Sequence, residues 1–343
     1  MRILGIETSC DETAASVVSG QENDLEVLSN IVSSQIDLHK KYGGVIPEVA
    51  AREHVLNVLP VINESLEKAG IEKEKAAREL DAIAVANGPG LVTSLIVGVE
   101  TAKSLSMAWD LPLIGVNHIE GHIYSNFLEY ASRIEFPAVA LTVSGGHTML
   151  VLIKSHFDYE VLGETKDDAA GEAFDKAAQL LDIGYPGGPG VSQKASEFDQ
   201  NSDMEFPRPM LKNRDLDFSF SGLKTSLLYK IKADEKWQDR IPEYCYKFQE
   251  AVTEVLVQKT LRAAKQYQAR SVMLAGGVSA NSFLREQLKQ GLSKKLPELE
   301  LFVPSFYYTT DNAAMIAAAG YYRATLSGTS SWKDVAVNCN SEL

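Results

Sequence analysis

The sequence feature that most constrains the fold is a pattern of strands and turns that occurs twice in the same order. Residues 2–19 are typical of two short strands joined by a turn rich in hydroxyl and carboxyl groups, and residues 139–153 repeat that arrangement. A buried strand that enters a glycine turn and then a helix occurs at 83–107 and again from residue 271. Because both units return in the same order, the sequence predicts a duplicated α/β domain.

The duplication predicts two lobes and places their boundary. The break at Glu135-Phe136-Pro137 assigns residues 1–135 to an N-terminal lobe and residues 136–304 to a second lobe. The segment from about 305–343 is expected to return to the first lobe. Glycine turns from both lobes would face a cleft, which is typical of the actin-like, sugar-kinase-like and heat-shock-protein-like ATPase (ASKHA) fold.

A pair of histidines marks the first lobe. His118 and His122 lie four residues apart, directly after an apolar stretch expected as a strand, so on a helix both imidazoles share one face and can reach one cation. The spacing alone is weak, because such pairs also arise by chance. Asp311 is a candidate third ligand if the chain returns to this lobe. The alternative is that Asp311 or Thr310 is only the N-cap of the helix that follows.

Composition limits the class of protein. At 343 residues, with 45% hydrophobic and 23% charged residues, the chain is long enough for two packed domains of a globular protein. No apolar run approaches the ~20 residues that span a membrane, and an acid as early as Glu7 argues against a signal peptide. Cys10, Cys245 and Cys339 are few and far apart, which predicts a reducing, cytoplasmic location without a disulfide framework.

The charge distribution has one local exception. The net charge of −13 argues against broad, non-specific binding of nucleic acids, because an acidic surface repels phosphates. Between Pro207 and Lys232, however, six basic residues and two acids give a local balance of +4. Such a run is usually a solvated face, and the alternative is a contact for a structured RNA through residues such as Lys212 and Arg214.

Two further stretches carry structural expectations. Tyr185–Gly190 is expected as a rigid loop because of its prolines and glycines. Asp217–Lys224 alternates hydroxyl and aromatic residues and is expected as an extended segment with Phe218 and Phe220 in the core. The thiol of Cys10 is expected to pack as a small residue rather than to act as a nucleophile.

Taken together, seven collinear motifs resemble those of the bacterial TsaD family of tRNA threonylcarbamoyladenosine biosynthesis proteins, formerly labelled O-sialoglycoprotein endopeptidases. The resemblance covers essentially the whole chain. Its motifs are Glu7–Thr13, His118–His122, Val143–Thr148, Gly171–Lys176, Tyr185–Pro189, Phe218–Lys224 and Ala275–Asn281.

The resemblance implies a transferase that moves a threonylcarbamoyl group from threonylcarbamoyl-AMP to the exocyclic amine of the adenosine 3′ of the anticodon, with release of AMP. The tRNAs concerned read codons that begin with adenine. The family also implies helper proteins: a shortened TsaB-like paralogue and a small TsaE-like ATPase.

The resemblance also assigns residues to roles. His118, His122 and Asp311 match the family's metal ligands, and the ion implied is Fe²⁺, with Zn²⁺ as the alternative. The positions that match its substrate site, with the role of Ser192 in doubt, are Thr142, Val143, Ser144, Gly145, Gly146, Asp175, Gly188, Ser192 and Asn281. As candidate catalytic groups we take Asp11 and Glu12 for contact with the incoming amine and His147 for support.

Two rival functions stay open at this level. A zinc peptidase of the H-E-x-x-H type needs a glutamate directly after the first histidine, but Ile119 stands there and Glu120 points about 100° further round the helix. A small-molecule kinase or ATPase would use the nucleotide fold, although a histidine pair is unusual for phosphoryl transfer.

Overall fold

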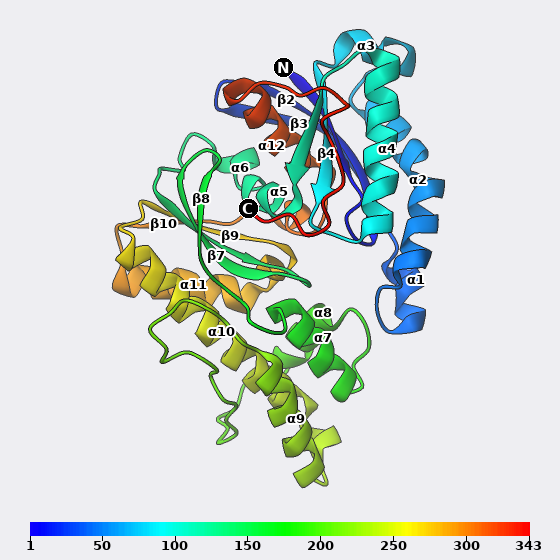
Figure 1. Cartoon of the computed structure of the whole chain (residues 1–343). Helices are drawn as coiled ribbons and strands as arrows, with labels where there is room; N and C mark the ends of the chain where they lie inside the picture. The colour runs from blue at the N-terminus through cyan, green and yellow to red at the C-terminus, as the bar shows by residue number, and fades with distance from the viewer. The chain divides into compact units, whose positions relative to one another are not determined.

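The computed structural model describes all residues from 1 to 343. The chain forms two compact units, of which unit 1 comprises Met1–Ile134 with Pro304–Leu343 and unit 2 comprises Glu135–Val303 (Figure 1). No helix is both long enough and apolar enough to cross a bilayer.

Unit 1 is built on a five-stranded sheet. Its strands are β1 (Arg2–Glu7), β2 (Glu12–Gln21), β3 (Asp24–Ser34), β4 (Ala82–Gly88) and β5 (Leu113–Asn117). Its helices are α1 (Ile36–His39), α2 (Pro47–Lys68), α3 (Ala76–Glu79), α4 (Val92–Trp109), α5 (His118–Tyr124), α6 (Phe127–Tyr130) and α12 (Ala313–Leu326), with short 3-10 helices η1 (Lys40–Tyr42), η2 (Lys73–Lys75) and η5 (Phe306–Tyr308).

Unit 2 is built on a second five-stranded sheet. Its strands are β6 (Ala138–Val143), β7 (Thr148–Ser155), β8 (Asp158–Glu164), β9 (Ser271–Ala275) and β10 (Glu300–Phe302). Its helices are α7 (Ala170–Leu180), α8 (Gly187–Ala195), α9 (Ser221–Ala233), α10 (Ile241–Gln266) and α11 (Ser282–Lys295), with 3-10 helices η3 (Trp237–Arg240) and η4 (Gly277–Ala280).

The two sheets have the same connectivity, which confirms the predicted duplication. In unit 1 the order is β3-β2-β1-β4-β5, with antiparallel pairing from β3 to β1 and parallel pairing from β1 to β5. In unit 2 the order β8-β7-β6-β9-β10 repeats this division. The sequence did not predict the edge strands β3 and β8, because their exposed polar residues interrupt the apolar alternation of a strand.

The sheet of unit 1 is covered on both faces. Helices α2 and α4 contribute Val58, Ile62 and Val99 to the core on one face, whereas α12 packs on β1, β2 and β4 (Figure 1). The approach of α12 is very close, since a Cβ at Gly5 of β1 would lie 2.3 Å from the carbonyl oxygen of Ala313. A helix of small residues meets glycine here, and the N-terminus of α12 is thereby held against the sheet.

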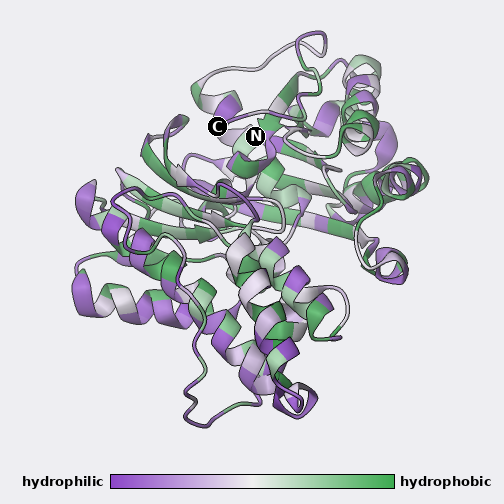
Figure 2. Ribbon diagram, turned by 60° about the horizontal axis from the view of Figure 1, so that its bottom comes forward, coloured by the Kyte–Doolittle hydropathy of each residue, from purple (hydrophilic) through white to green (hydrophobic).

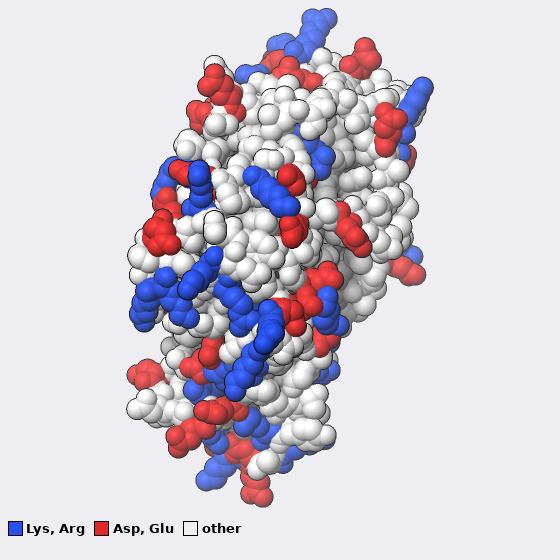
Figure 3. Space-filling model, turned by 60° about the vertical axis from the view of Figure 1, so that its left-hand side comes forward, with Lys and Arg blue, Asp and Glu red and all other residues white.

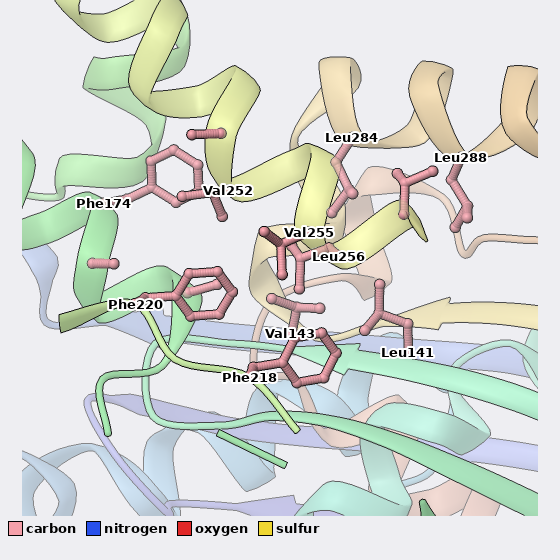
Figure 4. Close-up of a cluster of buried hydrophobic side chains, with 14 of the residues drawn as sticks. Leu141, Val143, Phe174, Phe218, Phe220, Val252, Val255, Leu256, Leu284 and Leu288 are labelled. Carbon is pink, nitrogen blue, oxygen red and sulfur yellow. The ribbon is translucent and has the colours of Figure 1, made fainter. Parts of the chain in front are cut away.

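The core of unit 2 forms between its sheet and helices α7 to α11. Leu141 and Val143 of β6 face Val255 and Leu256 of α10 (Figure 4). In the ribbon coloured by hydropathy, hydrophobic positions follow the strands and the inner sides of the helices, while hydrophilic positions lie on the outer sides (Figure 2). This division is what the amphipathic helix pattern predicts.

Two predicted segments of unit 2 differ from expectation. The expected loop at Tyr185–Gly190 is the start of helix α8, which begins at Gly187 after Pro186. The expected extended segment at Asp217–Lys224 ends at Phe220, because α9 begins at Ser221. Phe218 and Phe220 are fully buried, as predicted, with their rings stacked at 6.1 Å between centroids.

Candidate active site

The histidine pair lies on the short helix α5, directly after β5. The side chain of Asn117 caps this helix by accepting hydrogen bonds from the backbone N–H of Ile119 at 2.8 Å and of Glu120 at 3.3 Å. Both histidines are buried, and their rings meet edge to face with centroids 4.6 Å apart. Strand, cap and helix spacing therefore place both imidazoles together, as the sequence predicts.

Asp311 joins this pair from the far end of the chain. The expectation that Asp311 or Thr310 caps α12 is wrong: Asn312 is the N-cap, and its side chain accepts a hydrogen bond from the N–H of Met315 at 3.1 Å. The carboxylate of Asp311 is 20% exposed, and its Oδ1 lies 3.2 Å from His122 Nε2 and 3.6 Å from His118 Nε2. The cap is supplied by the next residue, so Asp311 is available to the histidines.

The geometry of the three side chains fits a metal ion. Their ligand atoms lie within 4.8 Å of one another. Atoms bound to one ion at about 2.0–2.2 Å are separated from each other by about 3.0–3.6 Å, close to the separations of Asp311 Oδ1 from the two rings. Neither ring nitrogen of His122 forms a hydrogen bond, although the residue is fully buried. A buried imidazole without a hydrogen bond is unfavourable unless a ligand takes its lone pair.

A buried glutamate orients His118. Glu7, at the end of β1, is fully buried and places Oε2 2.9 Å from His118 Nδ1, while Oε1 accepts a hydrogen bond from Ser9 N. The hydroxyl of Ser9 lies 3.1 Å from the same Nδ1. A carboxylate that accepts the Nδ1 proton leaves the Nε2 lone pair directed at a cation and makes it a stronger ligand.

The same carboxylates change the acidity of His118. Burial alone lowers the pKa, but the charges of Glu7 and Asp311 outweigh it and raise the pKa of His118 to about 9. A cation that binds Nε2 must therefore displace a proton at neutral pH.

The first hairpin turn brings two of the candidate catalytic groups to the same region of unit 1. Burial, followed by the charges of Asp311 and Asp11, raises the pKa of Glu12 well above its usual value. Burial and the same carboxylates also raise the pKa of Cys10, so its thiol is a poor nucleophile, as expected from the sequence. His54 of α2 supports this turn from beneath, because its Nε2 donates to Cys10 O at 2.9 Å and its Nδ1 lies 2.8 Å from Thr13 Oγ1.

The second hairpin turn lies in unit 2. Ser144 closes it, because its N–H donates to His147 O at 2.8 Å and its Oγ accepts from His147 N at 3.1 Å. Gly145 and Gly146 are exposed, and a Cβ on either would contact nothing within 4 Å. Their backbone amides are therefore accessible to an anion.

The end of β6 beside this turn is tightly built. Val143 and Thr142 are buried, and the hydroxyl of Thr142 has no hydrogen-bond partner. Gly276, with φ of +86°, follows β9 and approaches so closely that a Cβ there would lie 2.4 Å from Val143 O. Gly171 at the start of α7 likewise donates its N–H to Ser144 O at 3.2 Å. The turn, α7 and the end of β9 thus converge on one place.

The remaining predicted substrate residues also lie in unit 2. Asp175 of α7 accepts a hydrogen bond from the N–H of Gly187 at 2.8 Å, which joins α7 to the start of α8, where Gly188 and Ser192 lie. The side chain of Asn281 caps α11 by accepting from Leu284 N, and its amide donates to Gln249 Oε1 at 2.7 Å. The structure therefore groups His118, His122 and Asp311 in unit 1 and the predicted substrate residues in unit 2.

Comparison with known proteins identifies the family. The family model described as TsaD, tRNA N6-adenosine threonylcarbamoyltransferase, matches residues 26–318. The chain belongs to the TsaD family. A tRNA N6-adenosine threonylcarbamoyltransferase of Dehalococcoides mccartyi is 50% identical over 323 residues, which cover 94% of each chain. Another, of Geobacillus kaustophilus, is 49% identical over 343 residues, or 99% of this chain and 96% of that one.

A solved structure supports the fold of this TsaD-family chain. Full-length HypF in its phosphate- and nucleotide-bound form superimposes with a TM-score of 0.62 over 96% of this chain and 47% of HypF, at 15% identity. At this identity the likeness concerns the fold alone, and it agrees with the duplicated ASKHA architecture.

Three functional residues of this TsaD-family chain were missed by the sequence reasoning. Glu7 had a signal, because it begins the first recognised motif, but nothing local indicates that it reaches His118. Glu120 and Arg323 form a two-pronged ion pair at 2.8 and 2.6 Å that joins α5 to α12. Glu120 is 1% exposed, and its partner lies on another element, so only the folded chain shows the pair.

Proposed function

We propose that this protein transfers the threonylcarbamoyl group of threonylcarbamoyl-AMP to the exocyclic amine of the adenosine 3′ of the anticodon, in tRNAs that read codons beginning with adenine. The products are the modified tRNA and AMP. The observation that carries the proposal is about 50% identity to tRNA N6-adenosine threonylcarbamoyltransferases over nearly the whole chain.

We also propose that His118, His122 and Asp311 hold one divalent metal ion, Fe²⁺ in preference to Zn²⁺. Two imidazoles and one carboxylate suit both ions and leave coordination positions open to substrate oxygens. When bound, the ion would act as a Lewis acid toward the carbamoyl–phosphate end of the donor. The uncapped position of Asp311 and the unbonded nitrogens of His122 support this assignment.

The residues of the chain supply the other parts of the reaction. In the step itself, the adenine nitrogen forms a bond to the carbamoyl carbon, the bond from that carbon to the phosphate oxygen breaks, and one amine proton leaves. The exposed amides of Gly145 and Gly146 would stabilise the charge that grows on the departing AMP phosphate. Glu12, whose pKa is raised, is suited to accept the amine proton, with Asp11 beside it to orient the amine. His147 would hold the turn through its bonds to Ser144.

The rival functions are not favoured. In a peptidase, the glutamate of the histidine helix would activate water, but Glu120 is buried and engaged in two hydrogen bonds with Arg323. A kinase or ATPase would rest on the fold alone, since the two relatives named above are transferases that modify tRNA.

The proposal includes partner proteins and a cytoplasmic location. Val55, Leu56 and Leu59 on α2 are each more than half exposed, and an apolar face of this kind is typical of a contact with another protein chain. This supports binding of a TsaB-like paralogue, with a TsaE-like ATPase as a further partner. Free thiols at Cys10, Cys245 and Cys339 are consistent with the cytoplasm.

The test is mass spectrometry of tRNA nucleosides after incubation of unmodified tRNA with threonylcarbamoyl-AMP, the protein and its partner proteins. We expect threonylcarbamoyladenosine and an equal amount of AMP with the wild type, and a loss of at least about 100-fold with His122→Ala. His156→Gln, which changes a histidine of unit 2 packed on Phe136, is the matched control and should retain activity. Absence of product with every active partner preparation contradicts the proposal.

A further inference from the structure

The strongest charge asymmetry of the chain lies outside both groups of site residues. From Lys259 to Lys295 the sequence holds eight basic residues and one acid, Glu286, so this segment carries +7 and the rest of the chain −20. The segment spans the C-terminal part of α10, strand β9 and all of α11. It is more basic than the stretch 207–232 that the sequence analysis singled out.

The two helices bring these charges side by side. Lys295 Nζ donates to Gln258 Oε1 of α10 at 2.7 Å, and a Cβ at Gly291 of α11 would lie 2.8 Å from Leu261 of α10. Lys265 follows Leu261 by four residues, so both lie on the side of α10 that meets α11. The last turns of the two helices therefore form one continuous surface.

Part of the 207–232 stretch adds to this surface. Arg262 of α10 donates to the carbonyl oxygens of Leu211 and Asn213, which holds the loop containing Lys212 and Arg214 against α10. The rest of the stretch does not contribute in the same way. Arg208, for example, is neutralised by Glu250 and Glu254 at 3.1 and 2.8 Å. The structure thus divides the basic stretch that the sequence presents as one run.

We define the α10–α11 basic surface by six exposed side chains, none of which forms an ion pair: Lys212, Arg214, Lys265, Lys289, Lys294 and Lys295. The face of the molecule in Figure 3 shows such a gathering, where Lys and Arg side chains form a band across its middle. Basic residues in the last turn of a helix also stabilise the helix dipole. That role does not account for Lys289 in the middle of α11 or for the loop residues.

We propose that the α10–α11 basic surface binds the phosphate backbone of the tRNA, an inference that rests on the proposed function. Unpaired lysines and arginines spread over two helices and a loop match a row of phosphates, because each can neutralise one phosphate and release a counterion. The protein is otherwise acidic, so this surface is where a polyanion meets least repulsion.

The position of the surface selects a long ligand. It lies where strands β9 and β10 begin, whereas the Ser144 turn and Gly276 follow the opposite ends of β6 and β9. A six-residue strand such as β6 separates these ends by about 20 Å. A nucleotide bound at the turn does not reach that far, whereas the body of a tRNA does. The surface therefore holds the tRNA away from its reacting base.

The experiment measures the affinity of the full chain for an unmodified tRNA transcript, over a series of salt concentrations. The test variant carries Lys289→Glu, Lys294→Glu and Lys295→Glu, and a second carries glutamine at the same positions to limit repulsion. The matched control carries Lys68→Glu, Lys73→Glu and Lys75→Glu, which makes the same charge change on exposed lysines of unit 1. Circular dichroism checks that each variant is folded.

We expect the glutamine variant to lose about five- to eightfold in affinity at 0.1 M salt for each phosphate contact removed, with a salt slope smaller by about 0.7–0.9 per contact. The charge-reversed variant should lose more, and the control should change much less. Wild-type affinity and salt slope in both test variants overturn the proposal, including when those variants fail to bind a protein partner instead.

A parallel assay of threonylcarbamoyladenosine separates this proposal from the proposed function. Wild-type protein that makes no product, but loses tRNA on substitution of these lysines, refutes the transferase and retains the surface. Wild-type protein that makes product, together with test variants that bind and modify tRNA normally, refutes the surface and retains the transferase.

Discussion

Substitution of Glu7 by glutamine should weaken metal binding without unfolding the chain. Glu7 is fully buried, lies 2.9 Å from His118 Nδ1 and accepts a hydrogen bond from Ser9 N. Glutamine keeps the shape and an acceptor oxygen, so packing and the bond from the imidazole can persist. It removes the negative charge, and with it the increase in ligand strength that the carboxylate gives to His118.

The size of the effect depends on pH, because Glu7 strengthens the binding of a proton as well as of a metal. Loss of such a supporting carboxylate lowers metal affinity by about 10–100-fold. In the wild type the pKa of His118 is about 9, so between pH 6.5 and 8.5 each cation displaces one proton and affinity rises about tenfold per pH unit. In the variant burial dominates and lowers this pKa, so the contribution of His118 to the pH dependence disappears. The deficit should therefore be small near pH 6.5 and grow toward pH 8.5.

The assay is a competition titration of metal-stripped protein with Zn²⁺ and a chelator, at several pH values. Glu79→Gln, which alters a surface partner of Arg2, is the matched control and should follow the wild type. A variant whose affinity rises with pH as steeply as that of the wild type would show that Glu7 does not govern His118. Equal affinities at pH 8.5 would refute the supporting role altogether.

Three further substitutions test the packing around the sites. Arg323→Ala should cost about 3–5 kcal/mol in urea unfolding, because it leaves the buried carboxylate of Glu120 unpaired; removal of both side chains should cost less, and an additive double mutant would contradict this. Asp167→Ala should cost about 1 kcal/mol, since Asp167 accepts hydrogen bonds from the N-terminus of α9. Burial opposes but those hydrogen bonds lower the pKa of Asp167, so its contribution is complete above its usual value near 3.8 and is lost as pH falls through the folded-state pKa, a window that acid unfolding of both proteins should reveal. Lys259→Met should cost about 1–3 kcal/mol by removing the donor to the carbonyl of Asp217, and unchanged thermal stability would contradict that role.

The sequence by itself determined the local elements and their repetition. Hairpins, strand–glycine–helix units and the histidine helix could be predicted because side-chain periodicity and turn residues act over a few neighbours. Seven collinear motifs were also enough to indicate the family. Local signals misjudged Tyr185–Gly190, since proline and glycine are as suitable for the first turn of a helix as for a loop.

Only the tertiary structure decided which distant side chains meet. Glu7 reaches His118 because β1 and β5 flank β4 in one sheet, and Asp311 reaches His122 because α12 packs on glycine in β1 while Asn312 takes over the cap. The α10–α11 basic surface likewise exists only where two helices and a loop adjoin. Such contacts depend on packing between elements far apart in the chain, and no periodicity within a short segment encodes them.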